Sequence, residues 1–137
     1  MHLIAIVDEN LGMAFNRRRQ SRDRLLTARI CALAGAHTLW LSPYSLTLFD
    51  NSCRARLCAD EQFLERARPG ELCLTELTSP AQVQARVERL TLFRWNRSYP
   101  ADVQLGLSLE RGWRLISREE FAGASHPRIT QEAYERV

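Results

Sequence analysis

The sequence predicts a single α/β domain with a mostly parallel sheet, helices on both of its faces and an antiparallel C-terminal edge. Short apolar runs alternate with helical patterns up to about residue 90, and strand-like segments then follow one another closely. The 137 residues are 45% hydrophobic and 26% charged, without a linker or low-complexity tract. A chain of this length can bury roughly two-thirds of its unfolded surface. We therefore expect one domain, residues 1–137.

The N-terminal third contains the first strand and the first helix. Leu3–Val7 is apolar and β-branched, which favours a strand buried on both faces at the centre of the sheet. A polar loop follows over residues 8–12. From Arg22 the apolar positions have helical spacing, with Ser21 as the expected N-cap and Gly35 just past the end. The residues that define this stripe are Leu26, Ile30 and Leu33.

The middle of the chain continues the alternation. Thr38–Leu41 is expected to be a buried strand, and Ser42-Pro43 then opens a short helix toward Phe49. Residues 51–59 carry no clear pattern. Residues 60–67 are expected to be helical, Pro69-Gly70 to turn, and residues 72–77 to form a strand.

The last part contains one more helix and several strands. Ser79-Pro80-Ala81-Gln82 has the pattern of a capping box, and Val83, Val87 and Leu90 would form the apolar stripe of its helix. Three strands are expected after it, over residues 91–95, 103–109 and 113–116, the second with strict alternation of apolar residues. Helix propensity favours a helix over residues 130–136.

Composition excludes several classes of function. All nineteen basic residues are arginine, so Schiff-base chemistry and a Walker lysine are excluded. No apolar run approaches the ~20 residues needed to span a bilayer. The N-terminus lacks a basic signal-peptide region, so we expect a cytoplasmic protein. Without a C-x-x-C pair, Cys31, Cys53, Cys58 and Cys73 are expected to be structural free thiols, with no metal site.

Both ends of the chain resemble dihydrofolate reductases. Leu3 to Met13 is similar to their first strand, polar turn and active-site glycine, and Asp23 falls where that family has an acid at the start of its first helix. Residues 87–93 resemble the family's helix leading into a late strand. Tyr99-Pro100-Ala101-Asp102 and residues 112–117 and 134–136 resemble its aromatic-proline turn and last hairpin. The resemblance implies the same fold, and a terminal strand rather than a helix over residues 130–136.

The middle departs from that family where its cofactor binds. The family's glycine-arginine-threonine turn, which holds the NADPH phosphate, is replaced by Leu41-Ser42-Pro43-Tyr44-Ser45, and proline has no amide to donate. The family's paired glycines are replaced by residues 76–80, and its aromatic-proline approach to the first helix by residues 16–21. NADPH is thus a possible cofactor whose binding motifs are missing, and no cofactor is assigned.

The segment Phe15 to Arg24 is also similar to a small bacterial family that has been labelled ribonuclease Z. The zinc hydrolase of that name requires a histidine-rich motif, whereas this chain has three scattered histidines.

The most unusual feature is an arginine cluster at the start of the first helix. Arginines beside a helix N-terminus can bind phosphate or carboxylate by forked hydrogen bonds. They could equally form a solvated face that pairs with acids. The candidate ligand-binding residues here are Asn16, Arg17, Arg18, Arg19, Arg22 and Arg24.

Two titratable residues are candidate catalytic groups. As the counterpart of the family's acid, Asp23 would bind an aminopyrimidine-like ring; otherwise it simply complements the helix N-terminus, where the dipole and flanking arginines would keep it ionised. His126 lies in a loop-like setting, as a general-base candidate or as an ordinary loop residue. Trp95 and Tyr99 flank Arg97 and could stack a heterocycle or complete the core edge.

Three functional hypotheses follow. The first is a diverged dihydrofolate reductase-like protein that binds a small anionic or nucleotide-like ligand near Asp23, with reductase activity left open. The second is an RNA-binding, phosphate-binding or ribonuclease-like protein that uses the arginine cluster and the aromatic residues. The third is an interaction module for an acidic protein partner. The oligomeric state is not predicted.

Overall fold

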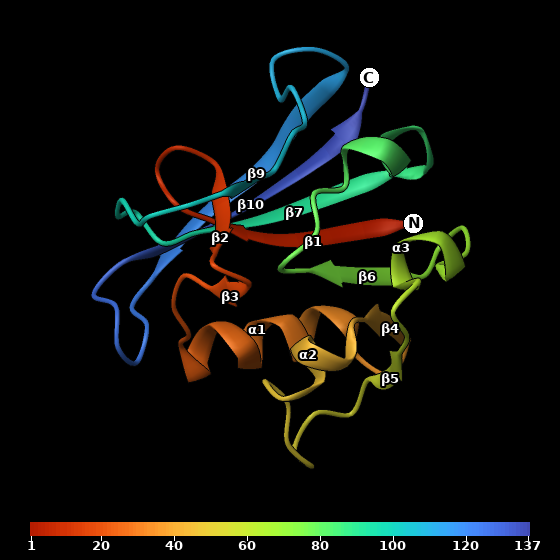
Figure 1. Cartoon of the computed structure of the whole chain (residues 1–137), viewed down its shortest axis with the longest axis horizontal. Helices are drawn as coiled ribbons and strands as arrows, with labels where there is room; N and C mark the ends of the chain where they lie inside the picture. Colours follow the sequence, from red (N-terminus) through yellow and green to blue (C-terminus); the bar gives the residue numbers. More distant parts are fainter.

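A seven-stranded mixed sheet organises the molecule, and the computed structural model describes all residues, 1–137. The strand order is β5-β4-β6-β1-β7-β10-β9 (Figure 1). Contacts among β5, β4, β6, β1 and β7 are parallel, and β10 is antiparallel to both β7 and β9. The predicted fold class is therefore confirmed. The strands are β1 His2–Val7, β4 Thr38–Leu41, β5 Arg56–Ala59, β6 Leu72–Thr75, β7 Arg89–Arg94, β9 Trp113–Phe121 and β10 Ile129–Arg136.

The first strand has the central position that its composition predicts. β1 lies between β6 and β7, and its alternate side chains enter two different cores. Leu3 and Val7 pack in one core with Phe63 of α3 (Phe63–Arg66). Ile4 and Ile6 pack in the other, beneath α1 (Arg24–Ala34). The apolar character of every position in this strand follows from burial on both faces.

The first helix is confirmed, but its predicted N-cap is wrong. Asp23, not Ser21, has the extended backbone of a cap, and its carboxylate accepts from the amides of Leu25 and Leu26. The hydroxyl of Ser21 instead contacts His126. Leu26, Ile30 and the cap glycine Gly35 lie where the periodicity predicts them.

The next predicted elements are present with shorter bounds. Ser42 caps α2 (Pro43–Leu46), whose first residue is proline. The expected helix over 60–67 is reduced to α3, a single turn. Residues 51–59, which gave no prediction, contain β5, a strand at the edge of the sheet beside β4.

The predicted helix after Ser79 is wrong. Residues Ala81–Arg86 form a 3₁₀ helix, η1, none of whose residues is buried. Leu90, the last member of the expected stripe, belongs to β7 and pairs with Leu3 of β1. Leu90 is thus part of a strand paired with the central strand and is not available to a longer helix. The hydroxyl of Ser79 donates to the Leu105 carbonyl and accepts from the Ala81 amide, while Pro80 occupies the N-cap position of η1.

The predicted strand over 103–109 is also largely wrong. Only Val103–Gln104 form a strand, β8, although Leu105 and Leu107 are fully or nearly fully buried. Gly106 has a φ of +73°, which ends regular strand geometry. Alternating burial here comes from a loop packed on the core, not from a sheet ladder.

Two further regions complete the architecture. A small sheet, β3-β2-β8, contains a hairpin that the sequence did not predict, formed by β2 (Gly12–Phe15) and β3 (Arg18–Arg19). At the C-terminus β10 lies between β7 and β9, so the strand implied by the family resemblance is confirmed over the helix favoured by propensity. No helix in the structure has the length and apolar character needed to cross a bilayer.

The cysteines differ from expectation. Cys31 of α1 and Cys53 of the loop before β5 form a disulfide with a Cα–Cα separation of 5.4 Å, while Cys58 and Cys73 are free. Burial raises the pKa of the Cys73 thiol to about 12. The prediction of free thiols is therefore wrong for one pair, because the loop over residues 47–55 returns to α1 in a way that cysteine spacing does not reveal.

Candidate functional site

The carboxylate of Asp23 is buried and fully engaged by the chain. Its two oxygens accept from five backbone amides, those of Leu25, Leu26, Ala124, Ser125 and His126. A side chain at Gly123 would collide with this arrangement, since its Cβ would lie 2.8 Å from the His126 carbonyl oxygen. Asp23 thus caps α1 and holds the loop over residues 123–126 against it.

The same contacts explain the ionisation of Asp23. Burial by itself favours the neutral acid, but the amide hydrogen bonds from Ala124, Ser125, Leu26 and Leu25 outweigh it and hold the pKa of this carboxyl below its ordinary value. The dominant donors therefore come from a loop a hundred residues away and from the helix N-terminus, not from the flanking arginines named above. A ligand could reach the Asp23 oxygens only if the 123–126 loop moved.

His126 lies between Asp23 and three hydroxyl groups. Its Nδ1 lies 3.0 Å from Ser125 Oγ and 3.4 Å from Asp23 Oδ2. Its Nε2 lies 3.0 Å from the Tyr99 phenol oxygen and 3.2 Å from Ser21 Oγ. Trp95 stacks on the imidazole with a centroid distance of 4.4 Å. With the proton on Nδ1, the imidazole would accept from Tyr99 or Ser21, which is the arrangement of a general base oriented by a carboxylate.

Four sequence candidates therefore meet in one place: Asp23, Trp95, Tyr99 and His126. Trp95 and His126 are almost completely buried, so stacking of a ligand on the Trp95 ring is not open in this conformation. Tyr99 is half-buried and also lines a hollow on the surface.

The candidate arginines fall into separate groups. Arg19 donates to the buried Glu76 through Nε and Nη2, at 2.9 and 3.0 Å, and its guanidinium stacks on Tyr44. Ser45 donates to the same carboxylate at 2.8 Å. Arg19 is thus engaged in an internal ion pair, while Arg17, Arg18, Arg22 and Arg24 are exposed.

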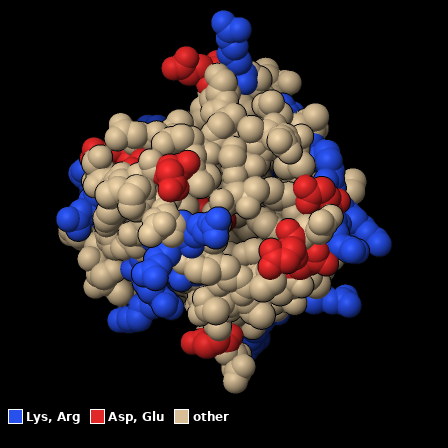
Figure 2. All heavy atoms as spheres, viewed as in Figure 1, with Lys and Arg blue, Asp and Glu red and all other residues tan.

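Arg17, Arg18, Arg22 and Arg24 are part of a surface on which basic side chains occur in several places. Figure 2 shows basic side chains over β3 and the beginning of α1. Asn16 and Arg17 form the tip of the β2–β3 hairpin, both with positive φ. Beside this hairpin lies a hollow of about 250 Å³, lined by Phe15, Asn16, Arg18, Arg19, Gln20, Tyr99 and Pro100.

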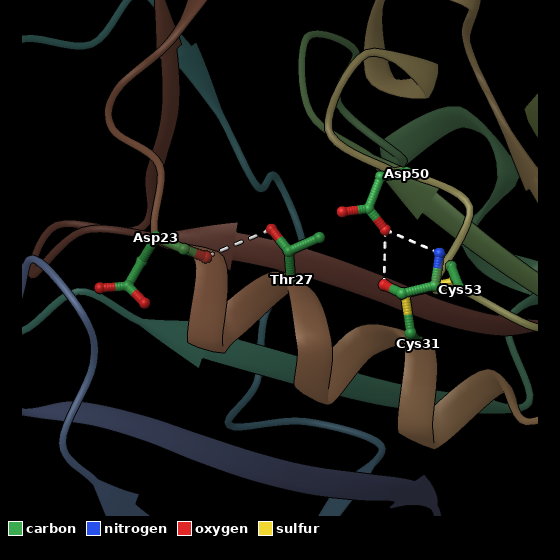
Figure 3. The surroundings of a disulfide bond; sticks show 6 residues. Asp23, Thr27, Cys31, Asp50 and Cys53 are labelled. Carbon is green, nitrogen blue, oxygen red and sulfur yellow. Dashed lines mark hydrogen bonds between the residues drawn. A yellow bond between two sulfur atoms is a disulfide. The ribbon is translucent and has the colours of Figure 1, made fainter.

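A larger cleft of about 670 Å³ runs along the outer side of α1. The helix wall contains Arg22, Arg24, Ala28 and Cys31, and the loop over residues 48–54 forms the opposite wall. Asp50 of this loop lines the cleft. Figure 3 shows the loop beside the helix at the disulfide, with the Asp23 carboxylate pointing away from Asp50 and from the disulfide. The volume is within the range of small-molecule sites.

Sequence reasoning missed several residues of these sites. Leu48, Phe49 and Arg54 line the cleft, and Glu76 and Ser125 occupy the polar clusters. None lies in a recognisable motif. No group of three or more His, Cys, Asp or Glu side chains is arranged to hold a metal ion.

A dihydrofolate reductase from Enterococcus faecalis, solved in complex with NADP(H) and RAB-propyl, superposes with a TM-score of 0.69 over 98% of this chain and 95% of that one. The chain has a dihydrofolate reductase fold. Sequence identity is 9%, so the likeness shows the fold alone. No protein-family model and no curated protein matches the sequence.

Two features of this chain lie at the carboxyl edge of its sheet, where open α/β folds bind ligands. At the carboxyl end of β4, Pro43 supplies no amide where a phosphate would be gripped. At the carboxyl end of β6, the buried carboxylate of Glu76 is paired with Arg19 and accepts from Ser45, so neither this carboxylate nor this guanidinium is free for a ligand at the edge where open α/β sheets bind them. This edge is filled by an internal ion pair.

Proposed function

We propose that the chain binds a small organic anion in the cleft along α1. The observation that carries this proposal is the combination of apolar walls and unpaired guanidinium groups around one cavity. Leu48, Phe49 and Ala28 offer apolar surface, and Arg22, Arg24 and Arg54 offer positive charge.

The three arginines are available to a ligand. None of them forms an ion pair within the chain, although Arg19, Arg29 and several others do. Asp50 is the one acidic residue of the cleft, and it accepts hydrogen bonds from Ser52. The balance of charge favours a ligand with a phosphate or carboxylate group and a planar or aliphatic body.

The ligand class supported by this chemistry includes nucleotides and folate-like acids. NADPH is a less favourable candidate, because the edge of the sheet near Pro43 and Glu76 does not fit its phosphates. A reductase reaction is therefore not part of the proposal. The protein would act as a ligand-binding domain.

A ligand panel tests this function. Thermal unfolding would be measured with 1-naphthyl phosphate, dihydrofolate, nucleoside monophosphates and NADPH, followed by calorimetric titration of any stabilising compound. A ligand at one hundred times its Kd should add about 2.7 kcal/mol of stability. We expect Arg24→Gln and Arg54→Gln each to weaken binding about tenfold, as loss of a charge-assisted hydrogen bond does. Arg111→Gln, remote from the cleft, is the matched control.

A second candidate, an RNA-binding or ribonuclease-like function, is favoured by the hollow at the β2–β3 hairpin. Exposed Arg18 and half-exposed Phe15 lie beside Tyr99, so a phosphate and a base could both find partners. In this proposal Asp23 orients His126, and His126 exchanges a proton with Tyr99 at the edge of the hollow.

Binding of a short single-stranded RNA, followed over a range of salt concentrations, tests the second candidate. A steep loss of affinity with salt, reduced in Arg17→Gln and Arg18→Gln, would support it, since phosphate contacts release counterions. Cleavage that disappears in His126→Gln would extend it to catalysis. Binding that does not respond to salt would count against it.

A further inference from the structure

One covalent bond joins the two walls of the α1 cleft. Cys31 lies on the helix wall of the cavity, and Cys53 lies in the loop that forms the opposite wall. The loop residues that line the cavity, from Leu48 to Arg54, are therefore positioned next to a crosslink to the helix they face (Figure 3).

The loop has no other polar attachment to α1. The amides of Thr47, Leu48 and Phe49 donate to carbonyls of residues 44–46, and the amide of Cys53 donates to Asp50. The side-chain hydrogen bonds of Thr47 and Ser52 are equally local. The hydrogen bonds of residues 47–55 thus join the loop to the end of α2 and stabilise its own turn, and none of them holds it against α1.

Besides the disulfide, the loop is attached by apolar contacts, and the side chains that make them are only partly buried. Leu48, Phe49 and Ala55 pack at the edge of the core beneath α1, but each remains partly accessible. Residues 50–52, which form the far end of the loop, are exposed. Regions with few buried contacts and only local hydrogen bonds open at low free-energy cost.

We propose that the Cys31–Cys53 disulfide controls this cleft: the oxidised protein keeps the loop wall in place and retains the anionic ligand, and reduction frees the wall and weakens binding. The ligand part of this inference rests on the proposed function. The structural part, a loop held by its crosslink, does not depend on it.

A dithiol reductant supplies the two electrons that reduction of the disulfide needs. One thiolate of the dithiol attacks a sulfur of the disulfide and forms a mixed disulfide, releasing the other cysteine as a thiolate that takes up a proton. The second thiol of the reductant then displaces the remaining cysteine and closes a cyclic disulfide. Cys31 and Cys53 are each reduced to a thiol, and the dithiol is oxidised.

Hydrogen exchange measures the structural part directly. Amides of residues 47–55 would be followed by mass spectrometry in the oxidised protein, in protein reduced with dithiothreitol, and in the Cys31→Ala/Cys53→Ala variant. We expect exchange in this segment to be at least tenfold faster in the last two, with the strands β1 and β7 unchanged. Reoxidation should restore protection, which separates loop release from loss of the fold. Cys58→Ser should behave like the wild type, since Cys58 is a free thiol of β5.

Titration with 1-naphthyl phosphate measures the functional part. We expect its Kd to rise about tenfold on reduction and in the double variant. If oxidised protein binds the probe and the reduced form binds it equally well with the same loop exchange, the inference is overturned. If peptide mapping of air-oxidised protein finds no Cys31–Cys53 bond, it is also overturned. If no form binds the probe while reduction still speeds exchange of the loop, the proposed ligand class fails and control of the loop by the disulfide stands.

Discussion

Asp23 connects two parts of the chain that are about a hundred residues apart. Its carboxylate caps α1 and also accepts from amides of the 123–126 loop, so one buried group holds the start of α1 and this loop together. The sequence predicts an acid at this helix start, and nothing in local spacing indicates that its partners lie near the other end of the chain. The sequence thus predicts an acidic cap at position 23, but it does not predict the amides of residues 124–126 that bind this acid.

Replacement of Asp23 tests this role. In Asp23→Asn one carboxylate oxygen becomes an NH₂ group, which cannot accept the hydrogen bonds that backbone amides donate to that oxygen. We therefore expect the free energy of unfolding, measured with urea, to fall by about 3 kcal/mol. Because the pKa of this carboxyl is lower in the folded protein, its stabilising effect is present above its ordinary value near 3.8 and is lost as pH falls further. Glu110→Gln, on the exposed surface, should leave stability unchanged.

His2 also makes stability depend on pH, but here folding favours the neutral side chain, whereas for Asp23 it favours the charged one. Burial and the nearby charges of Arg89 and the N-terminus lower the pKa of this imidazole to about 4. The unfolded chain therefore binds the proton more readily, and stability should fall as pH drops from 6.5 toward 4. We expect a decrease of up to about 3 kcal/mol in this window. His2→Gln can keep the hydrogen bond to Thr91, and the difference between its pH profile and that of the wild type isolates the effect.

At the scale of elements, the ion pair of Arg19 and Glu76 joins the β2–β3 hairpin to the end of β6. Glu76 is only 5% exposed, so removal of its partner would leave a buried charge uncompensated. We expect Arg19→Met to lower the unfolding free energy by about 3 kcal/mol and the Arg19→Met/Glu76→Met pair to recover most of this loss. Additive losses in this double-mutant cycle would show that the two side chains do not interact.

Elements with a strong local pattern could be predicted, and those formed by distant pairing could not. Three elements could be predicted from their own residues: β1 and β4 from their apolar runs, and α1 from its apolar stripe. The β2–β3 hairpin turns through Asn16 and Arg17 with positive φ, which the sequence of its short strands does not indicate. The spacing of Leu90 fits a helical stripe, but this residue lies in β7, where it pairs with Leu3 of β1.

For the whole molecule, β10 is the element whose position matters most to integrity. It lies between β7 and β9, so it joins the edge strand β9 to the rest of the sheet. We expect a protein ending at residue 128 to lose cooperative unfolding and to aggregate, because β9 would have no neighbour and β7 would become an open edge. Removal of Val137 alone, which is 86% exposed and donates a single backbone hydrogen bond to Gly112, should shift the melting curve little. A cooperative transition in the shorter protein would contradict this view of the sheet.

The stacking of Trp95 on His126 gives the protein an internal optical reporter. The indole senses whether the 123–126 loop is in place, since the imidazole that covers it belongs to that loop. With Trp40 and Trp113 replaced by phenylalanine, emission from the remaining indole would follow opening of the loop in real time, without a label. A change in this signal on addition of a compound would place its effect near Asp23 rather than at the disulfide.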